Sequence, residues 1–298
     1  CKQHALKHAA KSLMKIWCCS KGKIQDWKGK YEGAQQQAVP PEAVMAQARE
    51  MGYSGLECDL WRLNDRAEVK RQFDSCGLSA ASVYNMYDFL RDEPEVSKEK
   101  MLRHLETAAF FGAKKVLVIP GFFQPGDDRE SGYAKFAEQL AVMCGLAAQY
   151  GITVTMEDFD DSSSPCCDTA GLERLLTAVP GLRFTFDTGN FAYVLEDPAH
   201  AYARLKPYIA HVHLKDRSRD VSRSNADGSN AKADLSGAEM YPAECGGGYV
   251  GMEGLVKRLL ADGYAGEFSV EHFGAADQLE YMRRSAENVR RWISEVNK

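Results

Sequence analysis

Short apolar or β-branched segments alternate with longer amphipathic segments along almost the whole chain. The short segments predict β-strands, and the longer ones repeat apolar residues at the spacing of an α-helix. Gly52, Gly77 and Gly151 lie where a helix is expected to end and the next strand to begin. Strict alternation of this kind predicts parallel strands joined by right-handed helical crossovers.

Eight strands and eight helices are expected in this order. The expected strands cover residues 14–19, 55–58, 79–84, 115–119, 152–157, 182–187, 209–214 and 267–271. The expected helices cover residues 41–51, 65–76, 97–112, 131–150, 168–178, 197–206, 251–262 and 275–296. We interpret residues 1–13 as an N-terminal extension and residues 14–298 as one domain.

Nearly every expected strand is apolar along its length and ends in a polar or ionisable residue. In a closed barrel all the carboxyl ends of the strands surround one mouth, where barrel enzymes have their active sites. In an open sheet the same residues would be spread over roughly 35–40 Å, at about 4.8 Å per strand, and could not converge. The sequence therefore predicts an α/β fold, a single (β/α)8 TIM barrel.

One connection in this barrel is unusually long. Residues 215–250, between the seventh strand and its helix, are rich in Ser, Asp, Asn and Gly. Loops of more than about 15 residues in a compact domain are often lids over a functional site. We expect this loop to cover the mouth. Gly246, Gly248 and Gly251 fit a G-x-G-x-x-G pattern, but they follow a polar loop rather than a strand, so a glycine-rich hinge is favoured over a dinucleotide site.

Composition excludes several classes of function. The chain has 37 basic and 42 acidic residues, a net charge of −5, which argues against a nucleic-acid-binding protein. No apolar run reaches the ~18 residues of a membrane span. The nine cysteines show no C-x-x-C spacing, so free thiols in a reducing compartment, and hence a cytoplasmic protein, are expected.

Four consecutive strands each end with a residue type that binds metal ions. These residues are Glu157, Asp187, His213 and Glu271. Acidic residues at such positions also cap helices, which explains any one of them but poorly explains four in a row. Three carboxylates and one imidazole suit a single divalent ion: Mn²⁺ is expected first, with Mg²⁺, Co²⁺ or Zn²⁺ as alternatives.

The seventh strand contains two histidines on the same side. Side chains alternate along a strand, so His211 and His213 both point into the barrel. His213 lies nearer the mouth and is therefore the predicted ligand. We expect His211 to be a packed residue one layer below.

Motifs around these positions resemble the sugar phosphate isomerase/epimerase superfamily of xylose isomerase-like TIM barrels, which includes D-tagatose 3-epimerase-like enzymes and inosose dehydratase. They are Thr-Met-Glu-Asp, Phe-Asp-Thr-Gly-Asn, His-Val-His-Leu-Lys-Asp and Gly-Tyr-Ala-Gly-Glu-Phe-Ser-Val-Glu-His. The resemblance covers roughly residues 14–296. It implies the same four metal ligands, and it implies that Glu157 and Glu271 act as the acid/base pair.

Four further residues are predicted to bind substrate. In many members of the superfamily a histidine follows the strand-six Asp by three positions and touches substrate in the epimerases; Asn190 takes that place here. Lys215 shares its strand side with His213 and is expected to hold a substrate hydroxyl or carboxylate, the alternative being a solvated cation. Glu57 is a candidate hydrogen-bond partner of a sugar. Arg219 is a candidate anion ligand from the lid, although a solvated surface cation is favoured there.

Opposed carboxylates across the mouth predict proton transfer. The fifth and eighth strands lie three apart in an eight-membered ring, so Glu157 and Glu271 would face each other across a small substrate. We predict a divalent-metal-dependent isomerase/epimerase that removes an α-proton from a ketose or keto-sugar through an enediolate. The alternatives are a metal-dependent lyase, of the inosose dehydratase or 3-keto-glycoside-cleaving kind, and a non-catalytic sugar-binding barrel. The expected partner is a small sugar; the oligomeric state is left open, a homo-oligomer included.

Overall fold

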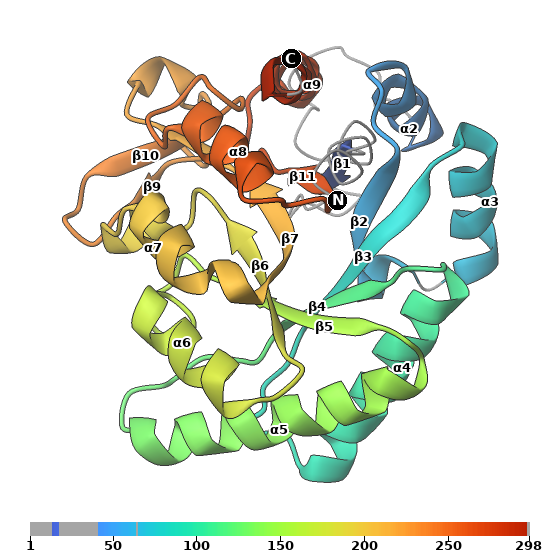
Figure 1. The fold of residues 1–298 in the computed structure, drawn as a ribbon, viewed down its shortest axis with the longest axis vertical. Helices are drawn as coiled ribbons and strands as arrows, with labels where there is room; N and C mark the ends of the chain where they lie inside the picture. The colour runs from blue at the N-terminus through green and yellow to red at the C-terminus, as the bar shows by residue number, and fades with distance from the viewer. Residues whose placement is uncertain (1–13, 18–40, 64, 297–298) are drawn as a thin grey trace.

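Eight parallel strands close into a barrel, and α-helices surround it (Figure 1). The computed structural model describes residues 14–17, 41–63 and 65–296. The strand order around the barrel is β1-β11-β7-β6-β5-β4-β3-β2. The barrel strands are β1 Met14–Trp17, β2 Gly55–Asp59, β3 Ser79–Met86, β4 Lys115–Ile119, β5 Thr153–Glu157, β6 Arg183–Asp187, β7 Ile209–Leu214 and β11 Phe268–Val270. The predicted TIM barrel is confirmed.

A helix follows each barrel strand along the chain. In the part of the chain that the structure describes, the α-helices are α2 Pro41–Glu50, α3 Arg66–Cys76, α4 Pro94–Phe110, α5 Arg129–Gln149, α6 Thr169–Ala178, α7 Pro198–Leu205, α8 Met252–Ala261 and α9 Gln278–Val296. Each overlaps the range expected from sequence. Several begin at an aspartate whose side chain accepts a backbone N–H of the first turn, as Asp128 does from Ser131 at 2.8 Å and Asp168 from Gly171 at 2.7 Å.

Alternation along the strands separates two environments. On β5, Val154 and Met156 belong to the apolar core between strands and helices, whereas the buried residues between and after them, Thr155 and Glu157, are polar. β6 and β7 show the same alternation of apolar and polar side chains. Because successive side chains point to opposite faces of a strand, these polar residues line the barrel interior. The half of the barrel formed by β5, β6 and β7 therefore carries its polar groups inside.

The long connection after β7 is partly regular. It contains β8 Asp216–Ser218, β9 Lys232–Ala233 and β10 Glu239–Ala243, which form an antiparallel sheet in the order β8-β10-β9. Its low periodicity in the sequence is explained by the shortness of these strands. The connection is thus a small folded unit rather than an irregular loop.

Two further expectations concern the ends of the chain and membranes. Residues 1–13, interpreted as an extension, lie outside the described residues, as do residues 18 and 19 of the expected first strand. Among the helices of the described segments, none combines the length and the apolar character that crossing a bilayer requires.

Candidate active site

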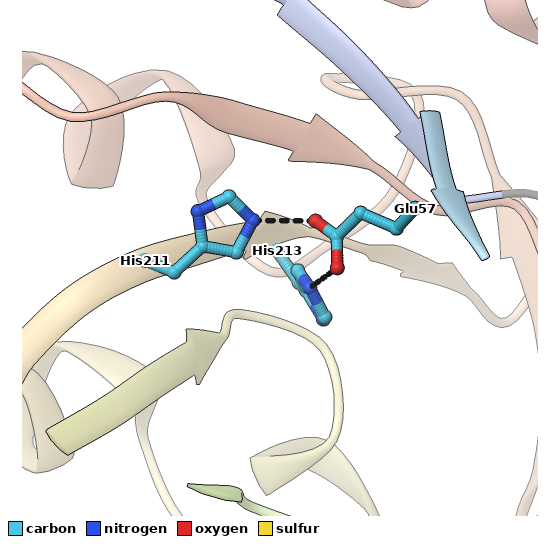
Figure 2. A group of neighbouring side chains, drawn as sticks. All are labelled: Glu57, His211 and His213. Atoms are coloured by element: carbon cyan, nitrogen blue, oxygen red, sulfur yellow. Dashed lines mark hydrogen bonds and ion pairs between the residues drawn. The ribbon is translucent and has the colours of Figure 1, made fainter. Parts of the chain in front are cut away.

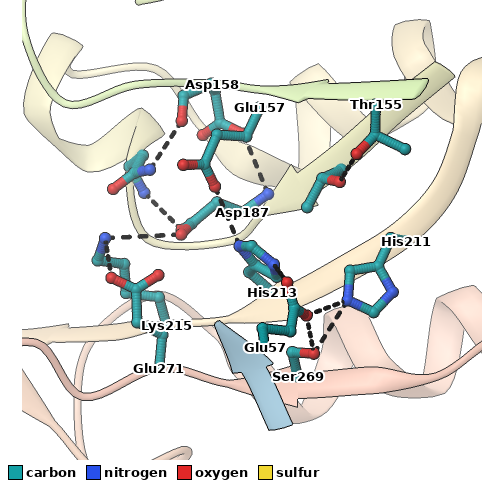
Figure 3. A network of polar contacts seen from close by, with 12 residues as sticks. Glu57, Thr155, Glu157, Asp158, Asp187, His211, His213, Lys215, Ser269 and Glu271 are labelled. Carbon is teal, nitrogen blue, oxygen red and sulfur yellow. Dashed lines mark hydrogen bonds and ion pairs between the residues drawn. The ribbon is translucent and has the colours of Figure 1, made fainter. Parts of the chain in front are cut away.

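The predicted ligands from three adjacent strands converge inside the barrel at its carboxyl-end mouth (Figure 3). Glu157 ends β5, Asp187 ends β6, and His213 lies near the end of β7. One ligand atom from each lies within 4.8 Å of the other two, and all three residues are buried. Asp187 and His213 are also register partners on neighbouring strands. The structure therefore brings together three of the four predicted metal ligands.

Asp187 is held so that one carboxylate oxygen remains available. Its Oδ1 accepts the backbone N–H groups of Gly189 at 2.7 Å and Asn190 at 3.0 Å. Its Oδ2 is buried and, among the described residues, has no hydrogen-bond partner. The turn needs glycine at 189 because a Cβ there would lie 2.4 Å from the carbonyl oxygen of Lys215. The loop after β6 thus fixes Asp187 with Oδ2 directed into the site.

Glu271, the fourth predicted ligand, is tied to this group through a lysine. Lys215 is buried, and its Nζ lies 2.8 Å from Glu271 Oε1 and 3.6 Å from Asp187 Oδ2. Figure 3 shows the lysine between the two carboxylates. Glu271 follows β11 directly and is not part of the three-residue group. The ammonium group of Lys215 therefore contacts the same two carboxylates, Asp187 and Glu271, that are predicted to bind a divalent cation.

The charges in this site are poorly balanced without a further cation. Burial, together with the charges of Asp187 and Glu271, raises the pKa of Glu157 despite the opposing effect of His213. Burial also raises the pKa of Asp187, although Lys215 opposes the shift. Burial acts in the same direction on Glu271, but Lys215 and His213 outweigh it and lower its pKa. A divalent ion would oppose both the effect of burial and the mutual repulsion that raise the pKa of Glu157 and Asp187.

The residues fit a divalent ion by the chemistry of their donor atoms. His213 Nδ1 lies 3.0 Å from Glu157 Oε2, and a neutral imidazole facing a carboxylate in this way needs a proton or a cation between the two acceptors. Asp187 Oδ2, which accepts no hydrogen bond from the described residues, lies in the same group. Carboxylate oxygens with one imidazole nitrogen suit Mn²⁺ or Mg²⁺, and tolerate Zn²⁺.

Glu57, predicted to bind substrate, faces both histidines of β7 (Figure 2). Its carboxylate contacts His211 Nε2 at 2.5 Å and His213 Nε2 at 3.3 Å, and it also accepts the hydroxyl of Ser269. Only 1% of Glu57 is exposed. His211 is packed below His213, as expected, but its bond to Glu57 was not predicted. The sequence did indicate that Glu57 on the second strand points into the barrel, and this was the one clue to its contact with His211.

Asn190 and Arg219, the remaining predicted substrate ligands, differ in position. Asn190 lies beside Asp187 and is buried; its Nδ2 donates to the carbonyl oxygen of Asp158 at 2.7 Å, and its Oδ1 has no partner among the described residues. Arg219 directly follows β8; it pairs with Asp234 and donates to the carbonyl oxygen of Ala238 at 2.8 Å. Its guanidinium is thus engaged within the connection itself.

The glycine-rich segment wraps an aspartate of its own chain. Asp216 accepts the backbone N–H groups of Gly246 at 2.8 Å, Gly248 at 3.1 Å and Val250 at 3.3 Å. A Cβ at Gly248 would lie 2.2 Å from Asp216 Oδ1. These amides therefore bind a carboxylate of the protein, which explains the G-x-G-x-x-G pattern without a nucleotide.

Sequence reasoning missed a pairing that joins the small sheet to the loop after β5. Asp160 accepts Arg217 and Lys232, each at 3.0 Å. These cations come from β8 and β9, so the contact fastens that sheet beside the mouth. Partners so distant in the sequence leave no local signal except the clustered acidic residues after Glu157.

Comparisons with known proteins match the chain to one family of barrels. A family model described as xylose isomerase-like TIM barrel matches residues 45–293. The rhizopine catabolism protein MocC of Rhizobium meliloti is 26% identical over 271 residues, covering 85% of this chain and 82% of that protein. The inosose dehydratase of Bacillus thuringiensis is 25% identical over 260 residues, covering 80% and 85%. A xylose isomerase-like TIM barrel protein from Mycobacterium smegmatis, solved in complex with magnesium, has a TM-score of 0.70 at 17% identity and covers 97% of this chain and 99% of that one.

Proposed function

The chain belongs to the xylose isomerase-like TIM barrel family, and from this premise we propose that it is a divalent-metal-dependent enzyme that removes a proton from the carbon next to a carbonyl group of a cyclic or open-chain keto-sugar. The observation that carries the proposal is the buried convergence of Glu157, Asp187 and His213 at the mouth of the barrel. Such a site is where barrel enzymes perform their chemistry.

The metal ion would be held by Glu157, Asp187, His213 and, on release from Lys215, Glu271. When bound, it polarises the substrate carbonyl and stabilises the negative charge that develops on its oxygen. Mn²⁺ is the proposed ion, with Mg²⁺, Co²⁺ and Zn²⁺ as alternatives; the related Mycobacterium smegmatis protein was solved with magnesium.

The two glutamates are the proposed acid/base pair. One carboxylate accepts the α-proton, and the second carboxyl group supplies a proton to the substrate. Their pKa values are shifted in opposite directions, upward for Glu157 and downward for Glu271, which suits one acid and one base. Lys215 lies between Asp187 and Glu271, where its ammonium group is placed to orient a substrate hydroxyl or carboxylate.

Dehydration is the first proposed outcome. The C–H bond next to the carbonyl breaks, a C=C bond forms, and the C–O bond at the β-carbon breaks; the departing hydroxide takes a proton from the second carboxyl group and leaves as water. The similarity to inosose dehydratase over 80% of the chain supports this outcome. A keto-inositol is the corresponding substrate class.

Epimerisation is the second candidate. Glu157 on β5 and Glu271 after β11 come from strands on different sides of the mouth, since β6 and β7 lie between them in the barrel order. A proton removed on one face could thus be returned on the other. The substrate class would then be a ketose or 3-keto-sugar.

One experiment separates these outcomes. The protein with Mn²⁺ is incubated in D₂O with keto-inositols, ketoses and 3-keto-glycosides, and followed by NMR and mass spectrometry. Exchange of the α-proton supports the proposal; loss of one water indicates dehydration, and an unchanged mass apart from deuterium indicates epimerisation or isomerisation. No exchange with any substrate would contradict it. Glu157→Gln should abolish exchange, whereas Glu173→Gln, at a surface pair with Arg204, should not.

A further inference from the structure

Below the metal ligands, one buried carboxylate gathers three hydrogen-bond donors, and the inference drawn from it rests on the metal site of the proposed function. Glu57 Oε1 lies 2.5 Å from His211 Nε2 and also accepts the hydroxyl of Ser269. Glu57 Oε2 lies 3.3 Å from His213 Nε2. These side chains come from β2, β7 and β11, and all are at least 99% buried. Figures 2 and 3 show both imidazoles directed at the one carboxylate.

The chemistry of this contact fixes the protons on both imidazoles. An ionised carboxylate only accepts hydrogen bonds, so His211 and His213 must each present Nε2–H to Glu57. A second observation agrees for His211: its Nδ1 is buried and has no hydrogen-bond partner among the described residues, as a bare Nδ1 allows. Both rings therefore carry the proton on the nitrogen that faces Glu57.

We propose that Glu57 is a positioning residue for the metal site. By binding Nε2–H of His213, it selects the tautomer that leaves the Nδ1 lone pair directed at Glu157, where the divalent ion would bind. His211 and Ser269 in turn hold the carboxylate of Glu57 in place. A carboxylate behind a ligating histidine typically changes metal affinity by roughly 10–100-fold when it is removed.

Glu57, His211 and His213 also lie within 4.8 Å of one another and could themselves be taken for a second metal site. Three donors already occupy the two oxygens of Glu57, so this group is complete without an ion. A metal there would have to displace the proton from Nε2 of both histidines. The proposal therefore requires one ion per chain, with Glu57 outside its ligands.

Glu57→Gln tests the proposal because it keeps the shape and removes the second acceptor. The amide oxygen can accept from one imidazole, but the amide nitrogen can only donate. One of the two histidines must then turn Nε2 into an acceptor and move its proton to Nδ1. In His213 that proton would lie where the metal binds.

The first measurement is calorimetric titration of the metal-free full chain with Mn²⁺. Wild type should bind one ion, and Glu57→Gln should bind it about 10–100-fold more weakly. Ser269→Ala should cost less than Glu57→Gln, because it leaves both imidazole contacts. The matched control is Thr155→Val, which removes the buried Thr185–Thr155 bond of 2.8 Å in the same layer without touching either histidine and should leave the affinity nearly unchanged.

The second measurement reads the histidine tautomers directly, first in wild type. Long-range ¹H–¹⁵N NMR of ¹⁵N-histidine-labelled wild type should show His213 protonated at Nε2, with and without Zn²⁺, and Glu57→Gln should move a histidine proton to Nδ1. If Glu57 had a purely structural role, Glu57→Gln would lower stability but would change neither the tautomer of the histidines nor the Mn²⁺ affinity of the folded protein.

The outcomes are distinguishable. The positioning role would be overturned by an unchanged affinity in a folded Glu57→Gln variant whose His213 carries its proton on Nδ1, by a bare Nε2 on wild-type His213, or by a second ion lost with Glu57. Wild type that binds no Mn²⁺ but keeps Nε2–H on His213 would contradict the proposed function instead.

Discussion

Two polar layers inside the barrel differ in how completely their groups are paired. The mouth layer comprises Glu157, Asp187, His213, Lys215 and Glu271; the lower layer comprises Glu57, Thr155, Thr185, His211 and Ser269. In the lower layer both oxygens of Glu57 accept donors, and Thr185 donates to Thr155, which donates to the carbonyl oxygen of Val116 at 3.1 Å. In the mouth layer Asp187 Oδ2 has no hydrogen bond among the described residues.

The difference separates support from function. Buried polar groups are normally satisfied, because an unpaired one costs roughly 1–3 kcal/mol. The lower layer follows that rule at Glu57, Thr155 and Thr185, and its one exception among the described residues is Nδ1 of His211. The mouth layer departs from it by gathering three acidic groups around Asp187 Oδ2, which has no hydrogen bond within the described segments and only the more distant Lys215 Nζ at 3.6 Å, as expected where a ligand completes the set. The predictions below test whether the two layers really divide in this way.

The largest effect is expected from Asp187→Asn. The new amide keeps the oxygen that accepts the N–H groups of Gly189 and Asn190. It replaces Oδ2, which accepts no hydrogen bond from the described residues, by an N–H donor. Mn²⁺ affinity should fall at least about 100-fold, because losing a direct ligand should cost at least as much as losing a residue that only holds a ligand in place, which costs up to about 100-fold. Calorimetric titration measures it. Asp168→Asn, at the matched cap of α6, should leave the affinity unchanged; equal losses in both variants would contradict the assignment.

Lys215→Met should destabilise the metal-free protein by about 3 kcal/mol, because it leaves Asp187 and Glu271 buried without their counter-charge. Mn²⁺ should restore more stability to this variant than to wild type. Urea unfolding with EDTA or with Mn²⁺ measures both. Lys257→Met, where an exposed lysine pairs with Glu253 and Glu295, is the control and should leave stability nearly unchanged. A metal-free Lys215→Met variant as stable as metal-free wild type would show that the mouth layer does not need the charge of Lys215.

His104 provides a reference outside both layers. It is buried, it contacts the hydroxyl of Tyr87 at 3.0 Å and the carbonyl oxygen of Val83 at 2.9 Å, and burial lowers its pKa from 6.5 to about 4. Between these values the unfolded chain binds the proton and the folded chain does not, so the free energy of unfolding falls as pH drops from 6.5 to 4.

The pKa shift of His104 should lower the free energy of unfolding by about 2 kcal/mol when the pH drops from 7 to 5. Comparing urea unfolding of wild type and His104→Gln at both pH values isolates it, because the other histidines are common to both proteins. Parallel losses in the two proteins would show that His104 is not a neutral, satisfied residue.

The smallest effect is expected in the lower layer from Thr155→Val. Loss of one buried hydroxyl pair should cost about 1 kcal/mol of stability. Its α-proton exchange rate should match that of wild type. A large loss of exchange without a loss of stability would mean that the lower layer takes part in the chemistry.

The fold and the three converging ligands were predictable from the sequence because both follow from local patterns. Period-two alternation places Thr155 and Glu157 on the inner side of β5, and the barrel topology then brings the strand ends together. The position of Asp187 follows in the same way from β6.

Other features depend on contacts between distant segments. Lys215 was expected to bind substrate, and only the folded chain shows it between Asp187 and Glu271. Glu57 was expected to bind a sugar, and only the folded chain shows its carboxylate against His211. No local pattern reports such pairings, which span up to 212 residues in the case of Ser269 and Glu57.

The most direct test of the account is a crystal structure of the full chain grown with Mn²⁺, with anomalous diffraction data collected at the manganese edge. The account predicts one anomalous peak in the barrel, bounded by Glu157, Asp187 and His213. Ordered side chains with no peak there, or a peak between Glu57 and His211 instead, would contradict it.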